Sequence, residues 1–192
     1  MRMGPGDALL VVDVQRDFLP GGALAVADGN AVVPVLNRYI ERARKAAIPV
    51  YASRDWHPAN HCSFRPRGGP WPPHCVRDTA GAEFAPLLAL PADATIVSKA
   101  TREDADAYSA FGGTTLATML RGRGVKRLLV GGLATDYCVL NTVRDALQEG
   151  FEVALLTDAI RAVDVKPGDG ARAEREMREA GAASVQLSDF AP

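Results

Sequence analysis

Short apolar runs that alternate with longer amphipathic segments constrain the fold of this chain more than any other feature of its sequence. Several runs are apolar at consecutive positions, as at residues 9–12 and 128–130, so side chains on both faces of such a strand must be buried. Strands of this kind belong to parallel sheets that are covered by helices on both sides. The pattern therefore predicts an α/β fold with three layers, in which helices flank a mostly parallel, twisted, Rossmann-like sheet.

The same alternation sets the expected order of the elements. We expect strands at residues 8–13, 49–54, 95–98, 127–131, 152–156 and 184–187, and helices at residues 31–47, 114–123, 136–149 and 169–180. Gly124 and Gly150 each follow a predicted helix and precede a strand, a position where helices commonly end on glycine. Neither an internal repeat nor a linker divides the sequence, so a single domain is expected over residues 1–192.

One long segment interrupts this alternation between about residues 56 and 94. It is rich in proline and glycine, above all at residues 65–73, and it contains both tryptophans and all three histidines of the chain. A loop of this length inside a compact domain is usually functional or disordered, and aromatic residues are scarce in disordered segments. We therefore expect an ordered excursion that covers a site.

Composition and charge exclude several classes of protein. The formal net charge is -1, and no basic block is interleaved with aromatic residues, so neither nucleic acid nor an anionic membrane is expected as a partner. The N-terminus lacks the apolar core of a secretory signal, and the longest strongly apolar run, at residues 8–12, is far too short to span a membrane. Three cysteines cannot all pair within one chain, which fits a reducing, cytoplasmic location.

Reactive side chains stand where four of the predicted strands end. Asp13, Asp55 and Lys99 follow or close the first three strands, and Cys138 comes after the fourth, near the start of the next helix. In open α/β sheets, ligands bind beyond the carboxyl ends of the strands. Two acids, a base and a thiol should therefore meet at one edge of the sheet.

Cys138 is the candidate nucleophile of this group. A thiol attacks as the thiolate, and the N-terminus of a helix lowers the pKa of a thiol and offers N–H groups to an oxyanion. Asp13 could remove the thiol proton, and Lys99 could stabilise the anions. The alternative is structural: a small buried cysteine, a surface lysine and a turn carboxylate. All three structural explanations would have to hold together, so we favour catalysis.

The histidine-rich segment offers ligands for a metal ion. His57, His61 and His74 lie close together in the sequence, beside Asp55 at a strand end. Imidazole and carboxylate groups suit Zn, Fe and Mn, and an incomplete set of protein ligands leaves room for water or substrate. Ordinary loop histidines are the alternative, but their clustering favours one divalent metal ion.

Aromatic residues near these motifs supply flat surfaces. Phe18, Trp71 and Tyr108 are expected to contact a substrate, and a flat heteroaromatic ring would stack on such side chains. Packing beneath the long loop is the alternative explanation, and for Trp56 we prefer it.

Five segments, taken together and in order, resemble the nicotinamidase branch of the isochorismatase-like hydrolases. They are Val12-Asp13-Val14-Gln15-Arg16-Asp17-Phe18, Asp55-Trp56-His57 through His61-Cys62-Ser63-Phe64, Trp71-Pro72-Pro73-His74-Cys75, Lys99-Ala100, and Gly132-Leu133-Ala134-Thr135-Asp136-Tyr137-Cys138-Val139. The resemblance extends from about residue 8 to about residue 187. The Asp, Lys and Cys segments are typical of cysteine hydrolases of the superfamily, whereas the Asp-Trp-His and Trp-Pro-Pro-His-Cys segments are specific to the nicotinamidase branch.

The resemblance implies an activity and a set of catalytic roles. The activity is that of a metal-dependent cysteine amidohydrolase, which converts nicotinamide, and also pyrazinamide, to the acid and ammonia through a thioester and serves NAD salvage. Asp13, Lys99 and Cys138 would form the catalytic triad. One divalent ion, with zinc favoured over iron and manganese, would bind to the set Asp55, His57 and His74, with His61 as a neighbour or a further ligand.

The resemblance also implies how the substrate is held. Phe18 and Trp71 would sandwich the pyridine ring. The peptide bond between Leu133 and Ala134 would be cis, an uncommon conformation without proline. It would turn the backbone amides of Ala134 and Cys138 toward the oxyanion.

Three other functions are compatible with the same residues. A related cysteine hydrolase acting on an N-carbamoyl compound or ureide would use the triad without needing the Asp/His cluster. A metal-hydroxide hydrolase would leave Cys138 structural and would survive iodoacetamide. A binding module would hold a metal or a pyridine without releasing ammonia. No heptad pattern or exposed apolar stripe decides the assembly, and a homo-oligomer is compatible with the sequence.

Overall fold

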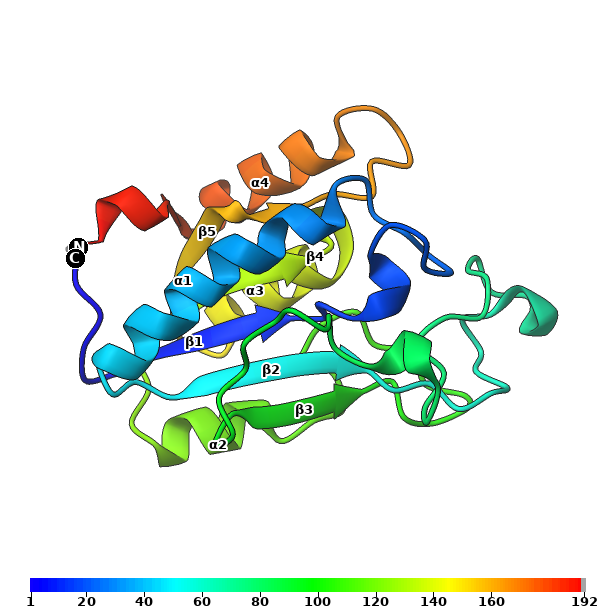
Figure 1. Ribbon diagram of the computed structural model, residues 1–192, viewed down its shortest axis with the longest axis horizontal. Coiled ribbons are helices and arrows are strands. Elements are labelled where there is room, and N and C mark those ends of the chain that lie inside the picture. Colours follow the sequence, from blue (N-terminus) through cyan, green and yellow to red (C-terminus); the bar gives the residue numbers. More distant parts are fainter. Residues whose placement is uncertain (191–192) are drawn as a thin grey trace.

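Six parallel strands form the centre of the computed structural model, which describes residues 1–190 (Figure 1). Their order across the sheet is β3-β2-β1-β4-β5-β6, and every neighbouring pair is parallel. Strands β2 and β3 follow β1 on one side of the sheet, and β4, β5 and β6 follow on the other side. The direction in which strands are added therefore reverses between β1 and β4. The strands are β1 (Asp7–Val12), β2 (Val50–Asp55), β3 (Thr95–Lys99), β4 (Arg127–Leu133), β5 (Glu152–Arg161) and β6 (Ala183–Val185).

Helices cover both faces of the sheet, because consecutive strand residues are apolar on both sides. On one face, α1 (Val32–Lys45) packs in a single apolar cluster with Leu9 and Val11 of β1. On the other face, Ala8 and Leu10 of the same strand belong to a second cluster. Three helices contribute to this second cluster: α2 (Leu116–Gly122), α3 (Leu140–Gln148) and α4 (Asp169–Glu179).

The predicted α/β fold, with a parallel sheet flanked by helices, is confirmed, and the expected elements differ mainly at their ends. β5 continues to Arg161, beyond the expected end at residue 156, because the strand resumes its pairing with β4 after a register shift. The helix predicted at 136–149 is divided into a one-turn π-helix (Thr135–Val139) and α3. Gly124 and Gly150 have φ of 67° and 85°, the left-handed conformation in which helices commonly end on glycine.

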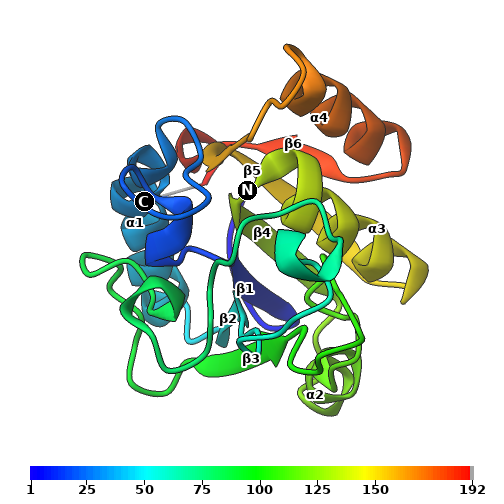
Figure 2. The same ribbon diagram turned by 90° about the vertical axis from the view of Figure 1, so that its right-hand side faces the viewer.

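The long segment between β2 and β3 is tied to the sheet by short elements. It contains 3₁₀ turns at Arg65–Arg67 and Ala80–Ala82, and isolated bridges join His57 to Val76 and Phe64 to Trp71. Figure 2 looks onto the carboxyl ends of the strands and shows this segment passing in front of them. The segment therefore lies at the edge of the sheet where the reactive side chains were expected.

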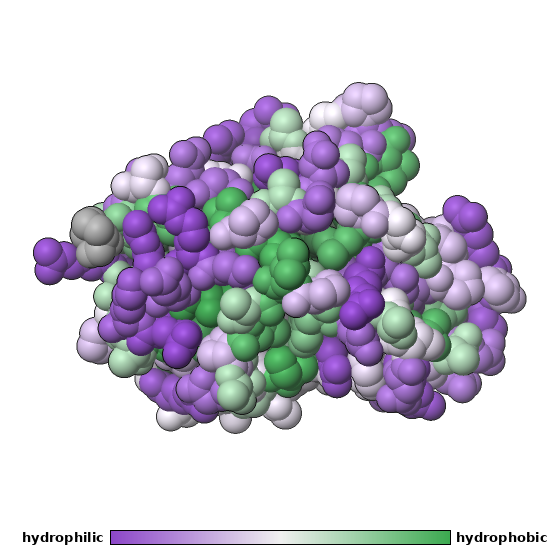
Figure 3. Space-filling view, viewed as in Figure 1, coloured by the Kyte–Doolittle hydropathy of each residue, from purple (hydrophilic) through white to green (hydrophobic). Residues whose placement is uncertain are grey.

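The face of the molecule that carries α1 is mostly hydrophilic, with an apolar patch near its centre (Figure 3). A shallow cavity here is lined by Val33 and Pro34 of α1 and by Pro86 and Leu87, the last with 81% of its surface exposed. Among residues 1–190, no helix is both long enough and apolar enough to cross a membrane.

Candidate active site

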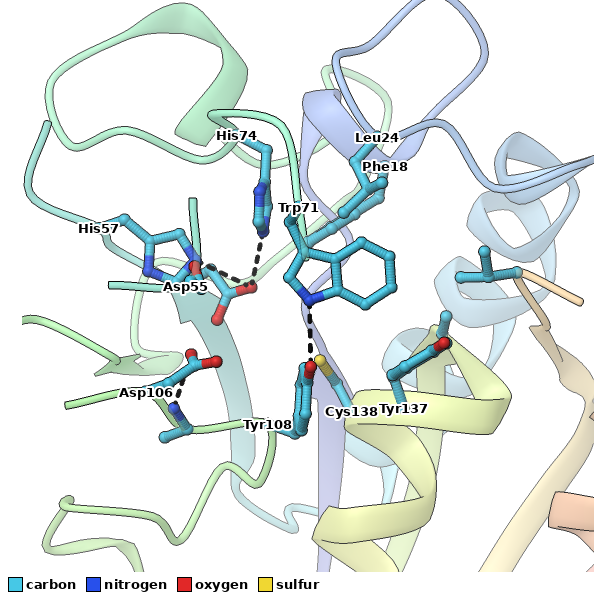
Figure 4. A pocket seen from close by; sticks show the side chains of 14 residues that line it. Phe18, Leu24, Asp55, His57, Trp71, His74, Asp106, Tyr108, Tyr137 and Cys138 are labelled. Atoms are coloured by element: carbon cyan, nitrogen blue, oxygen red, sulfur yellow. Dashed lines mark hydrogen bonds and ion pairs between the residues drawn. The ribbon is translucent and has the colours of Figure 1, made fainter. Parts of the chain in front are cut away.

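Two of the side chains predicted to be reactive, Asp55 and Cys138, line one cavity at the carboxyl edge of the sheet (Figure 4). The buried Lys99 contacts both of them and pairs with Asp13, although neither Lys99 nor Asp13 is part of the cavity lining. The cavity holds about 440 Å³ of empty space, including its opening to solvent. Cys138 lies on one side of it, and His57 and His74 lie on the other. Aromatic side chains stand between them, so a single small ligand can touch both groups.

Lys99 is the electrostatic centre of this site. Its side chain is buried, and its Nζ donates hydrogen bonds to Asp55 Oδ1 (2.5 Å), the Ala107 carbonyl oxygen (3.0 Å) and Cys138 Sγ (3.6 Å). Asp13 Oδ2 lies 2.9 Å from the same Nζ as an ion pair. Burial lowers the pKa of Lys99, but Asp13 and Asp55 raise it well above its usual value, so the ammonium stays charged.

Asp13 is held in place by the neighbouring strand. Its φ is 48°, in the left-handed region, where the chain turns sharply after β1. Ser53 Oγ donates to Asp13 Oδ1 at 2.7 Å, whereas Oδ2 accepts no hydrogen bond from the described residues. One carboxylate oxygen is therefore held by Ser53, and the other faces the Lys99 ammonium. Ser53 was not predicted, although a polar residue directly after the apolar residues 50–52 of a buried strand is a usable signal.

Burial dominates the ionisation of the thiol. It raises the pKa of Cys138 well above its usual value; Lys99 lowers this pKa, and Asp13 and Asp55 raise it further. The pKa of the thiol is therefore raised in the folded site, because desolvation outweighs the favourable charge of Lys99, and the contribution of the helix N-terminus stays a prediction. The resting thiol is protonated and needs a base. Burial also raises the pKa of Asp13, against the opposing charge of Lys99, which makes this carboxylate a better proton acceptor.

A second group, formed by Asp55, His57 and His74, brings three buried ligand atoms within 4.8 Å of one another. The Nδ1 atom of His74 lies 2.8 Å from the carbonyl oxygen of Pro72, and that of His57 lies 3.3 Å from the carbonyl oxygen of Ala100. A carbonyl only accepts, so each ring keeps its proton on Nδ1. Both Nε2 lone pairs then face Asp55 Oδ2, at 3.5 Å from His57 and 3.9 Å from His74.

The chemistry of this cluster fits a divalent cation. His57 Nε2 is buried and has no hydrogen-bond partner within residues 1–190, and an unsatisfied buried acceptor costs about 1–3 kcal/mol. Burial lowers the pKa of His74, which keeps the ring neutral, as metal ligation requires. Backbone carbonyls orient both imidazoles through their other nitrogen, the usual arrangement around ligating histidines. Two imidazoles and a carboxylate suit Zn, Fe or Mn.

His61 lies beside the cluster. Its ring stacks on that of His57, with the centroids 4.2 Å apart. Both of its nitrogens have protein partners: Nδ1 is 2.7 Å from Ser63 Oγ, and Nε2 is 3.2 Å from the carbonyl oxygen of Ala105. His61 was expected to be either a neighbour of the metal ligands or a further ligand, and its position here is that of a neighbour. Direct ligation stays a prediction, and it would require one ring nitrogen to give up its hydrogen-bond partner.

Aromatic rings wall the space between thiol and cluster. Trp71 and Phe18 both face the cavity, and the Phe18 ring also contacts His74, with centroids 5.6 Å apart. Trp71 Nε1 donates to Tyr108 Oη at 3.0 Å, and the Trp71 ring meets Tyr137 edge to face at 5.1 Å. Tyr137 was not predicted as part of the wall, although its place next to the candidate nucleophile was a signal for it.

Trp56 does not line the cavity. The guanidinium of Arg54 lies over its ring at 3.6 Å from the centroid, and the ring packs against the core on the α1 face. This agrees with the packing role that we preferred for Trp56.

The chain enters the π-helical turn through an unusual peptide bond. The bond between Leu133 and Ala134 is cis, as the resemblance implied. Ala134 and Cys138 both line the cavity, and the Ala134 carbonyl oxygen accepts from the N–H of Val139 at 3.0 Å. The role of the Ala134 and Cys138 amides toward an oxyanion stays a prediction.

A buried thiol, a buried carboxylate and a buried ammonium that meet at the edge of a parallel sheet form a site of the cysteine-hydrolase type. Residues 7–187 match the Isochorismatase domain, and the chain belongs to this family. It is 43% identical over 207 residues to the nicotinamidase of Escherichia coli (strain K12), and the match covers 97% of each protein.

Solved structures show the same similarity in three dimensions. The crystal structure of the pyrazinamidase of Pyrococcus horikoshii in complex with zinc superposes with a TM-score of 0.92 at 54% identity, covering 95% of this chain and 100% of that one. The crystal structure of PnC1 from L. infantum in complex with nicotinate superposes with a TM-score of 0.90 at 36% identity, covering 100% and 99%.

Proposed function

We propose that this protein is a nicotinamidase, which hydrolyses nicotinamide to nicotinic acid and ammonia in NAD salvage through a thioester on Cys138. One observation carries the proposal: a single cavity is lined by Cys138 on one side and by a buried Asp–His–His cluster on the other, with aromatic rings between them, and the buried Lys99 contacts Cys138, Asp13 and Asp55. The group formed by Cys138, Asp13 and Lys99 suits acyl transfer, and the rings suit a flat heteroaromatic amide. Similarity to the E. coli nicotinamidase supports this substrate, and nicotinate, the product of the proposed reaction, is bound in the L. infantum protein.

Acylation begins with the transfer of the thiol proton from Cys138 to Asp13, whose raised pKa suits a general base and whose carboxylate oxygen lies within 4.8 Å of the sulfur. The thiolate attacks the carboxamide carbon, and the backbone amides of Ala134 and Cys138 receive the oxyanion. Asp13 then returns its proton to the amide nitrogen as the C–N bond breaks. Ammonia leaves, and the acyl group stays on Cys138 as a thioester. Lys99 holds its charge throughout and stabilises the anions that form around it.

Deacylation repeats this sequence with water. Asp13 takes a proton from the water molecule as its oxygen attacks the thioester carbon. The C–S bond breaks, Asp13 returns the proton to the sulfur of Cys138, and nicotinic acid leaves the cavity. The protein thus regains its starting state after consuming one water and one amide.

Asp55, His57 and His74 would hold the divalent ion, with His61 supporting His57 or joining as a further ligand. Zinc is the favoured ion, with iron or manganese as alternatives, and its presence in the P. horikoshii protein supports this choice. When bound, the ion would supply a Lewis acid on the side of the cavity opposite the thiol. Asp55 also pairs with Lys99, so one carboxylate belongs to both groups.

The proposal is tested by ammonia release from nicotinamide, measured on purified reduced protein before and after treatment with a chelator. We expect release that is lost on chelation and restored by adding back Zn²⁺, Fe²⁺ or Mn²⁺, the best of which identifies the working ion. Pyrazinamide should be hydrolysed under the same conditions. A fully metallated, reduced protein that releases no ammonia from nicotinamide would refute the proposal.

Trp71→Ala should raise KM for nicotinamide about tenfold or more, with a smaller effect on kcat. The substitution removes the indole that faces the cavity, and an aromatic contact of this size is worth about 1.5–2 kcal/mol. Tyr108→Phe is the matched control, since it deletes only the hydroxyl that accepts from Trp71 Nε1. Steady-state kinetics of both variants check this, and an unchanged KM for Trp71→Ala would remove Trp71 from the substrate site.

A further inference from the structure

Beyond the end of β1, a residue of the following loop makes hydrogen bonds to the backbone of β2. The pairing of β1 with β2 stops at Val12 and Ser53. Beyond it, the fully buried Gln15 accepts from the backbone N–H of Asp55 at 2.8 Å through Oε1 and donates to the Asp55 carbonyl oxygen at 2.8 Å through Nε2. The same Nε2 donates to the Ala82 carbonyl oxygen at 2.9 Å. One side-chain amide therefore clamps both backbone polar groups of Asp55.

Two residues further on, the Asp17 side chain accepts hydrogen bonds from the backbone next to His74. Its Oδ2 accepts from the N–H of Cys75 at 2.7 Å, and its Oδ1 accepts from the N–H of Ala23 at 3.2 Å. Cys75 directly follows His74, and its carbonyl oxygen accepts from the N–H of His57 at 3.0 Å. The Asp17 carboxylate thus holds the backbone of Cys75, which is covalently bonded to His74 and hydrogen-bonded to His57.

The surroundings of Asp17 are built to fit the carboxylate. A Cβ atom added to Gly81 would lie 2.2 Å from Asp17 Oδ2, so the glycine makes room for this side chain. Cys75 has a φ of 45°, in the left-handed region, and its N–H points to Asp17 in this conformation. A non-glycine residue rarely adopts this φ without support from its surroundings.

Neither Gln15 nor Asp17 lines the cavity, so they act through the residues they hold. We propose that Gln15 and Asp17 are positioning residues of the metal site, which fix the backbones of Asp55, His57 and His74 so that three ligand atoms converge. This inference rests on the metal site of the proposed function. It explains why a polar and an acidic residue follow Asp13 at alternate positions, although neither has a part in the chemistry.

The test is the dissociation constant for Zn²⁺, measured by competition with a chromophoric chelator on metal-free protein. Gln15→Met keeps the length of the side chain but leaves the Asp55 N–H and two carbonyls without their partner. Asp17→Asn keeps the shape and one acceptor. Removing groups that orient ligands typically costs 10–100-fold in metal affinity, so we expect an increase of about this size for Gln15→Met and of about tenfold for Asp17→Asn.

Thr142→Val is the matched control. Thr142 is fully buried, and its Oγ1 accepts from the backbone N–H of Ala110 at 2.9 Å, so the variant also deletes a buried bond between side chain and backbone. We expect it to bind Zn²⁺ within about twofold of wild type, while its unfolding midpoint in denaturant falls as that of Gln15→Met does.

The proposal would be overturned if Gln15→Met and Asp17→Asn bound Zn²⁺ as tightly as wild type while their unfolding midpoints were lowered. Both residues would then be merely structural. If Gln15→Met does not fold, Asp17→Asn decides the question alone. A wild-type protein that binds no Zn²⁺ would refute the metal site together with this inference. Because the titration uses no substrate, its result is independent of whether the protein hydrolyses nicotinamide.

Discussion

Cys138→Ala is expected to lower kcat for ammonia release from nicotinamide by at least about 10⁴-fold, because no other group in the site can form the thioester. The substitution removes one sulfur atom, and neither Asp55, His57 nor His74 depends on it for position. Zn²⁺ content, measured by elemental analysis, should therefore equal that of wild type.

Cys62→Ala is the control for this experiment. Cys62 is also a free thiol, but it lies outside the cavity and is partly exposed. Its variant should keep wild-type activity and should remain sensitive to iodoacetamide through Cys138. Near-normal hydrolysis by Cys138→Ala would instead assign the chemistry to a metal-hydroxide route and leave the cysteine structural.

Lys99→Met should give the largest loss of stability among single substitutions in the site. It removes the ammonium that lies 2.9 Å from Asp13 Oδ2 and 2.5 Å from Asp55 Oδ1, both of them buried. Leaving a buried charge without its partner costs about 3–5 kcal/mol. Chemical denaturation of the metal-free protein measures this loss, and ammonia release should disappear with it.

Two further variants test whether the loss of stability comes from the missing counter-charge of the buried carboxylates. Lys45→Met removes an exposed ammonium that pairs with Glu41 on the surface of α1, and it should leave the unfolding midpoint unchanged. Adding Asp13→Asn to Lys99→Met removes one uncompensated carboxylate and should restore part of the lost stability. If the double variant is no more stable than Lys99→Met, the charge explanation is wrong.

The fold was predictable because its main signals are local. Apolar runs such as 9–12 can be satisfied only by a strand covered on both faces, and glycines at positions 124 and 150 mark where helices must stop. The convergence of Asp13, Asp55, Lys99 and Cys138 follows in turn from the geometry of parallel strands, whose carboxyl ends share one edge.

What could not be predicted depends on packing between distant segments. Whether the surroundings of Cys138 raise or lower its pKa depends on how completely the folded chain excludes water, and burial is the largest cause of the raised pKa. The partners of His61, namely Ser63 and the Ala105 carbonyl, come from two separate loops, so their distances appear only in the folded chain. The division of the helix around Cys138 into a π-helical turn and α3 has no sequence signal that we can identify.

The sharing of Lys99 between two carboxylates bears on how this scaffold can be redesigned. Its three N–H groups are already committed to Asp55, to Ala107 and to Cys138, so the ammonium has no capacity left for a new partner. The Asp–His–His half and the thiol half of the site are consequently not separable modules. An engineer who converts the protein to a metal-free hydrolase by replacing Asp55 must also supply another acceptor for Lys99, or the nucleophile will lose its geometry along with the ion.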